Sequence, residues 1–443
     1  MGGVVLLSIN GPPKLIAMFR IAFFLYQLVL PVVCLLVAPA WLLKMIRRGG
    51  WGSGLVERLG IYSREAEFEK QGSVYVHAVS VGEVLLALKM IEAWRAKTGD
   101  HFTLVPTTAT GMAVAREKAP DFVRVIYAPV DFSWLMRRTY RRFSPRAIVL
   151  VESELWPNLI LQASRMGIPI GVVNARLSQR SEKRLRLLGS LVAPIIGSLD
   201  RIGVPEEADL CRWQSIGAKK EATQVTGNLK FDSEGATAPR RRTEFAGMIA
   251  DFGTDRPVVM AVSTFTGEDE WLAEAFLNCG KNVLPVIVPR HAERREQAAL
   301  AIEALTGRKV IKRSRFTEPM GDEVFLIDST GELRDWTAHA DVIVIGKSFL
   351  AKGGQNLGEA IQAGIAVISG PHMANFEPFV SELVMAGGLQ VVSSREQLIA
   401  AVRDCLEDSS AQTALARTVA EKHRGAVSRT ITLFEVAEGL VSS

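Results

Sequence analysis

The sequence of 443 residues has little cysteine and no pattern of metal ligands. Its four cysteines lie far apart, and none of them forms a Cys-x-x-Cys pair. The spacing of the cysteines suggests neither a disulfide framework nor a zinc site, and the six histidines lack metal-ligand spacing as well. The sequence therefore predicts neither disulfides nor a bound metal, which fits a reducing compartment.

Several nucleotide-binding and hydrolase motifs are also absent. No Gly-x-Gly-x-x-Gly opens a helix, no Gly-x-Ser-x-Gly is present, and no Asp-x-Asp pair offers a metal to a sugar diphosphate. Gly346-Lys347-Ser348 resembles the end of a Walker A loop, but Asp341 stands where its first glycine should be. These absences count against P-loop enzymes, α/β-hydrolases and metal-dependent transferases, and no cofactor is expected.

The net charge of +5 is mildly basic, with clusters such as Arg137-Arg138 and Arg240-Arg241-Arg242. No basic stretch is interleaved with aromatic residues, so we expect no nucleic-acid partner. Basic clusters are typical of solvated faces. They also suit contact with anionic lipid or a phosphorylated substrate.

The N-terminal region contains a long apolar run. Ile21 to Leu43 carries no formal charge over 23 residues, and Arg20, Lys44, Arg47 and Arg48 flank it. A membrane span needs about 20 apolar residues, and prolines do not exclude one. We expect an uncleaved anchor within residues 1–50, with its C-terminal side cytoplasmic. A cleaved signal peptide ending near Ala38-Pro39-Ala40, a buried helix and an interfacial helix are the alternatives.

From Val74 onward, short β-rich runs alternate with helical patterns, which predicts parallel sheets covered by helices. The first series of candidate strands is Val74 to Val76, Phe102 to Val105, Val123 to Tyr127, Ala147 to Val151, Pro169 to Val173 and Arg201 to Val204. The second series is Val258 to Val262, Val283 to Val288, Val324 to Ile327, Val342 to Ile345, Ile365 to Ile368 and Leu389 to Val392.

Two such series predict an α/β protein with two doubly wound, Rossmann-like domains that face a cleft. We place the first domain at 51–230, a linker at 231–255, the second domain at 256–425 and a C-terminal helix at 426–443. A helical pattern from Ala411 to Leu440 could pack back across the domain junction.

The stretch from His77 to Glu83 is the most informative motif. It joins a buried strand to a helix at Val84 to Ile91. A Ser-x-Gly turn therefore places Glu83 at a helix start beside the carboxyl end of a strand, where open α/β sheets bind ligands. An ionised carboxylate there can act as a general base. The alternative is a residue that only complements the helix dipole.

Three further motifs follow strands of the first domain: Glu152-Ser-Glu-Leu-Trp-Pro-Asn158, Asn174-Ala-Arg-Leu-Ser178 and Gly227-Asn-Leu-Lys-Phe-Asp232. The carboxylates of the first motif either cap the next helix or face the cleft near Glu83. Lys230 is a candidate cation for a developing negative charge, or an ordinary surface lysine.

The second domain carries polar segments at similar positions. Arg290, after a strand, could clamp a phosphate bidentately. The hydroxyls and turn of Asp328 to Leu333 suit anion binding at a helix start. The glycine-rich turn of Gly353 to Ala360 presents free N–H groups, and Glu359 could accept hydrogen bonds from ribose.

Taken together, these segments resemble the 3-deoxy-D-manno-octulosonic acid (Kdo) transferases of Gram-negative lipopolysaccharide synthesis, over residues 20 to 435. The most specific matches are His77-Ala-Val-Ser-Val-Gly-Glu83, Glu152-Ser-Glu-Leu-Trp-Pro-Asn158, Asn174-Ala-Arg-Leu-Ser178, Gly227-Asn-Leu-Lys-Phe-Asp232, Pro289-Arg-His291 and Gly370-Pro-His-Met-Ala-Asn-Phe376.

The resemblance implies an inverting, metal-independent GT-B glycosyltransferase. Its donor would be CMP-Kdo and its acceptor lipid IVA, at the cytoplasmic face of the inner membrane. The family pattern implies that Glu83 is the base and that Glu152 and Lys230 stabilise the transition state. It assigns CMP binding to Pro289, Arg290, Thr330, Gly331, Glu332, Asn356, Leu357, Gly358 and Glu359.

The chain departs from the family pattern at three donor-side positions. Phe265 stands where the family usually has His, Lys347 where it usually has Gly, and Leu357-Gly358 where it usually has Pro-Leu. Two alternatives therefore stay open: a related GT-B enzyme with another CMP-activated acid sugar or another surface-glycan acceptor, and a non-catalytic membrane-bound binding protein. The number of Kdo residues added is not readable from the sequence.

Overall fold

The computed structural model describes residues 13–47, 53–63, 72–232, 239–377 and 379–439. The chain divides into two compact units. Unit 1 comprises residues 1–234 and 425–443, and unit 2 comprises residues 235–424. Each unit is built around one sheet of seven strands.

The sheet of unit 1 is parallel, with the strand order β3-β2-β1-β4-β5-β6-β7. Its central strands are fully buried, as expected for β-branched runs covered on both faces. The strands are β1 (Val74–Ala78), β2 (Phe102–Pro106), β3 (Val123–Val125), β4 (Ala147–Val151), β5 (Ile170–Val173), β6 (Arg201–Val204) and β7 (Thr223–Val225).

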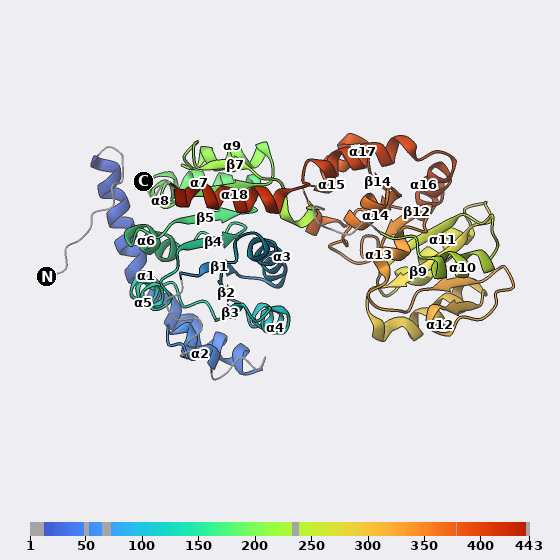
Figure 1. The fold of residues 1–443 in the computed structure, drawn as a ribbon, viewed down its shortest axis with the longest axis horizontal. Helices are drawn as coiled ribbons and strands as arrows, with labels where there is room; N and C mark the ends of the chain where they lie inside the picture. The colour runs from blue at the N-terminus through green and yellow to red at the C-terminus, as the bar shows by residue number, and fades with distance from the viewer. Residues whose placement is uncertain (1–12, 48–52, 64–71, 233–238, 378, 440–443) are drawn as a thin grey trace. The chain divides into compact units, whose positions relative to one another are not determined.

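Helices cover both faces of this sheet (Figure 1). On one face, Trp94 packs against Phe102 and against Phe434 near the C-terminus. The core of the other face includes Tyr140 and Trp213. The helices are α2 (Ser53–Arg58), α3 (Val81–Thr98), α4 (Ala109–Lys118), α5 (Ser133–Phe143), α6 (Pro157–Arg165), α7 (Gln179–Leu187), α8 (Gly189–Ile196), α9 (Glu207–Ser215) and the 3-10 turn η2 (Leu229–Phe231).

The sheet of unit 2 is also parallel, with the order β10-β11-β9-β8-β12-β13-β14. Its strands are β8 (Val258–Thr264), β9 (Leu284–Pro289), β10 (Val310–Lys312), β11 (Val324–Leu326), β12 (Val342–Ile345), β13 (Ala366–Ser369) and β14 (Gln390–Val391).

The helices of unit 2 alternate with these strands. They are α10 (Thr243–Asp251), α11 (Glu268–Leu277), α12 (Arg295–Thr306), α13 (Leu333–Thr337), α14 (Gly358–Ala363), α15 (Phe379–Ala386), α16 (Arg395–Glu407) and α17 (Ser410–Glu421), with 3-10 turns η3 (Ala292–Arg294), η4 (Arg313–Arg315) and η5 (Ala374–Phe376).

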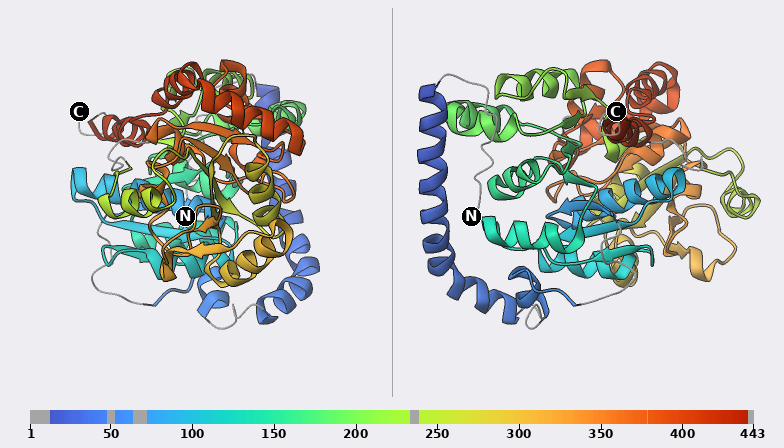
Figure 2. Two further views of the ribbon diagram at one scale, coloured as in Figure 1. Left: turned by 90° about the vertical axis from the view of Figure 1, so that its right-hand side faces the viewer. Right: turned by 60° about the vertical axis from the view of Figure 1, so that its left-hand side comes forward.

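The apolar N-terminal run forms the 35-residue helix α1 (Pro13–Arg47), which stands beside the other elements of unit 1 (Figure 2). Its segment Ile16–Ala40 is long and apolar enough to cross a membrane, and it is the one such helix among the described residues. Tyr26 Oη donates a hydrogen bond of 3.0 Å to Asp131 Oδ2, and Gln27 donates one to Asn158. Two polar side chains in the middle of the apolar run therefore dock on unit 1.

The C-terminal helical pattern is divided into two helices. Gly425, at φ 75°, separates α17 from α18 (Ala426–Gly439). The chain returns there to unit 1, because Asp232 accepts hydrogen bonds from the N–H groups of Gly425 (2.8 Å) and Val427 (2.6 Å). Figure 1 shows α18 in red across the first sheet, and it packs on α3 and β6.

Candidate active site

Strand order locates a site within unit 1. The chain runs outward from β1 through β2 to β3, and then outward on the other side from β4 to β7. The order reverses between β1 and β4, and open α/β sheets bind ligands at the carboxyl ends of the strands at such a switch point. Glu83 follows β1 and Glu152 follows β4, so the two neighbouring strands bring both predicted carboxylates to that point.

Glu83 forms a capping box at the start of α3. Ser80 Oγ and Ser80 N donate to Glu83 Oε1 at 2.7 and 3.3 Å, and Val79 N donates to Oε2 at 2.7 Å. Glu83 N donates in return to Ser80 Oγ at 3.3 Å. Glu83 therefore caps the start of α3, and the Ser-x-x-Glu signature of this box was readable in the sequence.

The capping hydrogen bonds do not occupy every acceptor site of the Glu83 carboxylate. A carboxylate offers about four lone-pair sites on its two oxygens. Three donors occupy three of them, two on Oε1 and one on Oε2. One site on Oε2 is left to accept a proton, while the three donors keep the side chain in one orientation.

Glu152 and Lys230 are predicted site residues that the structure brings together. Lys230 Nζ lies 2.6 Å from Glu152 Oε1, with the side chains 33% and 30% exposed. Glu152 has a left-handed backbone at φ 62°, which is uncommon outside glycine and concentrates at functional sites. Asn174 Oδ1 accepts a hydrogen bond of 3.0 Å from Leu229 N, which holds the turn of Lys230 above the sheet.

A third carboxylate, Glu154, belongs to this group although it was not among the predicted catalytic residues. Burial raises the pKa of the Glu154 carboxyl, a hydrogen bond from Trp156 lowers it, and the charges of Glu83 and Glu152 raise it. Trp156 Nε1 donates that bond at 2.9 Å. In the sequence, Glu154 could have been recognised as the second carboxylate of Glu-Ser-Glu directly after a strand.

His77 lies under this cluster in β1. Its ring is 6.0 Å from that of Trp156, edge to face. Neither ring nitrogen has a hydrogen-bond partner among the described residues. Burial lowers the pKa of His77 to about 4, so the imidazole is neutral at neutral pH.

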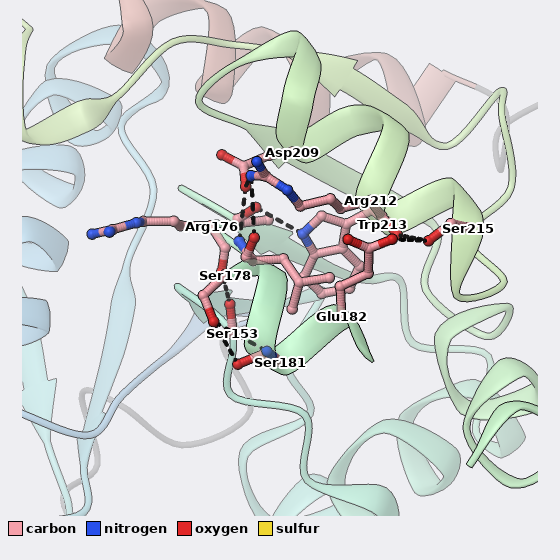
Figure 3. Close-up of polar contacts among 11 residues, drawn as sticks. Ser153, Arg176, Ser178, Ser181, Glu182, Asp209, Arg212, Trp213 and Ser215 are labelled. Carbon is pink, nitrogen blue, oxygen red and sulfur yellow. Dashed lines mark hydrogen bonds and ion pairs between the residues drawn. The ribbon is translucent and has the colours of Figure 1, made fainter. Parts of the chain in front are cut away.

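The loop after β5 is fixed through its backbone (Figure 3). Ser153 donates to Arg176 O, Leu177 N donates to Asp209 Oδ1 at 2.9 Å, and Trp213 Nε1 donates to Ala175 O at 2.7 Å. The side chain of Arg176 points away from the other labelled residues in this view. The loop is therefore held rigidly while its arginine extends outward.

In unit 2 the strand order reverses between β8 and β12. Arg290 follows β9, and its N–H donates to Thr264 O at the end of β8 at 3.1 Å. Burial raises the pKa of Glu359, and the positive charges of Arg334 and Arg290 lower it. The predicted CMP-binding residues Arg290 and Glu359 are thus close enough to interact.

The remaining predicted CMP-binding residues lie at the same edge with different partners. Glu332 is within 3.6 Å of Arg242 and 3.5 Å of Arg313, and Gly331 has a left-handed backbone at φ 80°. Asn356 Oδ1 accepts a hydrogen bond of 3.0 Å from Gly358 N, the first residue of α14. The others are buried Pro289, exposed Thr330 and buried Leu357. Within the described part of the chain, no group of His, Cys, Asp or Glu could hold a metal ion.

Two doubly wound units, each built on a parallel sheet of seven strands, define the GT-B fold. The UDP-GlcNAc 2-epimerase of Neisseria meningitidis has a similar fold, with a TM-score of 0.54 and 14% sequence identity over 84% of this chain and 100% of that one. This similarity concerns the fold alone.

Sequence comparison identifies the family. Residues 53–233 match the family described as 3-Deoxy-D-manno-octulosonic-acid transferase (kdotransferase). The 3-deoxy-D-manno-octulosonic acid transferase of Bordetella pertussis is 33% identical over 89% of this chain and 95% of its own length. That of Haemophilus influenzae is 30% identical over 86% and 90%. The chain belongs to the Kdo transferase family, the glycosyltransferases of lipopolysaccharide biosynthesis.

Proposed function

We propose that this protein transfers Kdo from CMP-Kdo to lipid IVA with inversion at the anomeric carbon. The observation that carries the proposal is the group of Glu83, Glu152, Glu154 and Lys230 at the switch point of unit 1, in a chain of the Kdo transferase family. In this proposal, region 51–230 binds the acceptor and performs the chemistry, and region 256–425 binds the CMP-sugar.

Glu83 is the proposed general base. A sugar hydroxyl is a poor nucleophile, and a positioned base accelerates its attack by about 10²–10⁴-fold. Glu83 Oε2 accepts the hydroxyl proton as the acceptor oxygen bonds to the anomeric carbon of Kdo. The bond from that carbon to the CMP phosphate oxygen breaks with its electron pair, and CMP departs. A single displacement of this kind inverts the configuration.

Lys230 and Glu152 are proposed to stabilise the transition state. Charge accumulates on the phosphate as CMP leaves, and a preorganised ammonium lowers the energy of that charge. The 2.6 Å ion pair with Glu152 fixes the ammonium before the substrate arrives.

The donor contacts are proposed to lie at the carboxyl edge of unit 2, meaning the side of the sheet where its strands end. Arg290 would bind the phosphate and Glu359 the ribose hydroxyls. The N–H groups near Thr330, Gly331 and Asn356 to Gly358 would complete the CMP site. An arginine fork suits phosphate geometry, and the mutual attraction of Arg290 and Glu359 keeps both side chains at this edge.

We also propose that α1 anchors the protein in the inner membrane, with both units in the cytoplasm. Residues along the helix, including Phe24, Leu28, Leu35 and Leu36, are exposed. The apolar segment of 25 residues offers its exposed side to lipid, while Tyr26 and Gln27 hold its other side against unit 1. An anchored enzyme meets a lipid acceptor in the plane of the membrane.

Mass spectrometry of lipid IVA incubated with CMP-Kdo and purified full-length protein tests the proposal. Stepwise gain of Kdo masses, absent with Glu83→Gln, is the expected result, and the number of steps gives the number of sugars added. A folded protein that binds CMP and adds no mass would show that the donor or acceptor is different.

A second candidate is transfer of another CMP-activated acid sugar. The contact between Phe265 and Lys347 at the donor edge favours it. The Lys347 ammonium lies 5.0 Å from the centre of the Phe265 ring. The family usually has His in place of this Phe and Gly in place of this Lys. Competition binding among CMP-linked acid sugars discriminates between the two.

A further inference from the structure

The switch point of unit 2 carries two residues that the proposed CMP site does not use. Phe265 is the first residue after β8, and Lys347 is the second after β12. These strands are neighbours, and the strand order reverses between them. The crevice at their carboxyl ends is where an open α/β sheet binds its ligand.

A buried carboxylate holds the two residues in register. Glu268, fully buried at the start of α11, accepts at Oε2 from Phe265 N (3.1 Å) and from Lys347 N (2.5 Å). Its Oε1 accepts from the next loop positions, Phe349 N at 3.0 Å and Leu350 N at 3.2 Å. Glu268 is therefore a positioning residue that joins the loop after β8 to the loop after β12.

The side chains of the two residues meet as well. Lys347 Nζ lies 5.0 Å from the centre of the Phe265 ring, within the range of a cation–π contact. The same ring lies 5.4 Å from that of His291, edge to face. His291 follows Arg290 directly, so the aromatic pair links the lysine to the loop of the proposed phosphate-binding arginine.

Lys347 occupies a costly backbone conformation. Its φ is 56°, in the left-handed region that glycine adopts without penalty and other residues avoid. Among the described residues, no carboxylate forms an ion pair with its ammonium. A strained position thus keeps a cation at a ligand-binding edge without a counterion, and residues of this kind concentrate at functional sites.

We infer that Phe265 and Lys347 form a donor-recognition pair, in which the ring holds the ammonium ready for an anionic group of the CMP-sugar. That group is either the phosphate or the carboxylate of the acid sugar, which share the same chemistry. The inference rests on the proposed function and adds a specificity determinant to its donor site.

Calorimetry of the full-length protein with CMP and with cytidine, together with the KM for CMP-Kdo, tests the pair. The variant Lys347→Met keeps the length of the side chain and removes its charge. Lys352→Met is the matched control, because Lys352 is an exposed lysine of the same loop. Loss of a charge-assisted hydrogen bond should weaken the affected step by about tenfold or more.

The two anionic groups give different patterns. If the phosphate is bound, Lys347→Met weakens CMP about tenfold and leaves cytidine unchanged. If the carboxylate is bound, CMP affinity stays the same and the KM for CMP-Kdo rises about tenfold. Phe265→Leu should produce about a two- to fivefold effect on the same quantity, and no further effect when Lys347 is already Met.

Each failure has its own signature. Wild-type protein that binds CMP and transfers Kdo, with Lys347→Met indistinguishable from Lys352→Met in both assays, overturns the pair and leaves the proposed function intact. Wild-type protein that neither binds CMP nor transfers Kdo overturns the proposed function and the pair with it.

Discussion

The two units share one architecture and differ in the charge that collects at the carboxyl edge. In unit 1, Glu83, Glu152 and Glu154 interact at the point where the strand order reverses. In unit 2, the corresponding edge carries cations, Arg290 and Lys347, beside the carboxylates of Glu332 and Glu359. The sheet thus decides where a site lies, and the loops decide which chemistry it can perform.

Each edge also places a buried or half-buried carboxylate against backbone N–H groups. Glu83 receives such bonds within its own helix start, and it keeps a free lone pair. Glu268 accepts four such hydrogen bonds from two loops, so all of its lone-pair sites are occupied and the residue only positions the loops. The same kind of residue can therefore be a candidate base in one unit and a structural tie in the other.

The largest expected effect separates the two roles of Glu83. Glu83→Gln keeps a capping side chain and removes the base, so transfer should fall by about 10²–10⁴-fold with CMP binding unchanged. Ser80→Ala is the control. It breaks the capping box, should lower the free energy of unfolding by about 1 kcal/mol, and should lower the rate far less than Glu83→Gln does, because the Val79 and Ser80 N–H groups still hold the carboxylate. Initial rates with CMP-Kdo and lipid IVA measure both, and near-normal turnover of Glu83→Gln would exclude this residue as the base.

The next effect probes the carboxyl edge of unit 2, where Arg290 lies. Arg290→Met should weaken CMP about 10- to 100-fold in calorimetry, because a charge-assisted contact with the phosphate is lost. Arg308→Met is a suitable comparison, since Arg308 precedes β10 and therefore lies at the amino edge of the same sheet. Equal affinities for both variants would remove Arg290 from the donor site.

The ion pair between Lys230 and Glu152 should matter for rate far more than for stability. Its side chains are about one-third exposed, and exposed pairs contribute about 0–1 kcal/mol. Lys230→Met should lower kcat by about tenfold or more with a small change in the melting temperature. A large loss of stability with an unchanged kcat would assign the pair a structural role.

The smallest effects concern the pH dependence of folding in unit 1, where two buried groups act in opposite directions. Burial raises the pKa of Asp131 to about 6, so the folded state holds a proton that the unfolded chain releases, and stability falls as pH rises from about 4 to 6. Burial lowers the pKa of His77 to about 4, so stability gained from the neutral ring rises with pH up to about 6.5.

Urea unfolding between pH 4 and 7 separates these terms. Asp131→Asn should remove the loss of stability on raising the pH through this window, so that its unfolding free energy rises more steeply with pH than that of the wild type. His77→Gln should remove the increase of the unfolding free energy with pH that His77 causes. Parallel pH profiles for the wild type and both variants would show that neither group titrates differently on folding.

Much of the fold was predictable because the central strands are long β-branched runs with turns between them. Ala147 to Val151 and Arg201 to Val204 match β4 and β6 residue for residue. The missed strands β7 and β10 have three residues each, contain polar side chains and lie at sheet edges, where a short apolar pattern is too weak to detect.

The sequence predicted which strand ends carry the site residues. It did not predict which of these residues contact one another. The position of Glu83 after β1 followed from the sequence, whereas its approach to Glu154 depends on β4 being the neighbour of β1. Strand order is a property of the whole fold. The contact of Phe265 with Lys347 likewise joins residues 82 positions apart that no local pattern relates.

The closure of unit 1 by Asp232 and α18 has a consequence for biosynthesis. Residues 425–443 belong to unit 1, so its C-terminal helix is synthesised after the whole of unit 2. Domains generally fold in the order of their synthesis. Here unit 2 is complete before unit 1, and the sheet of unit 1 keeps one flank uncovered until α18 has been synthesised. A premature stop shortly before Gly425 would therefore damage the earlier-made unit more than the later one.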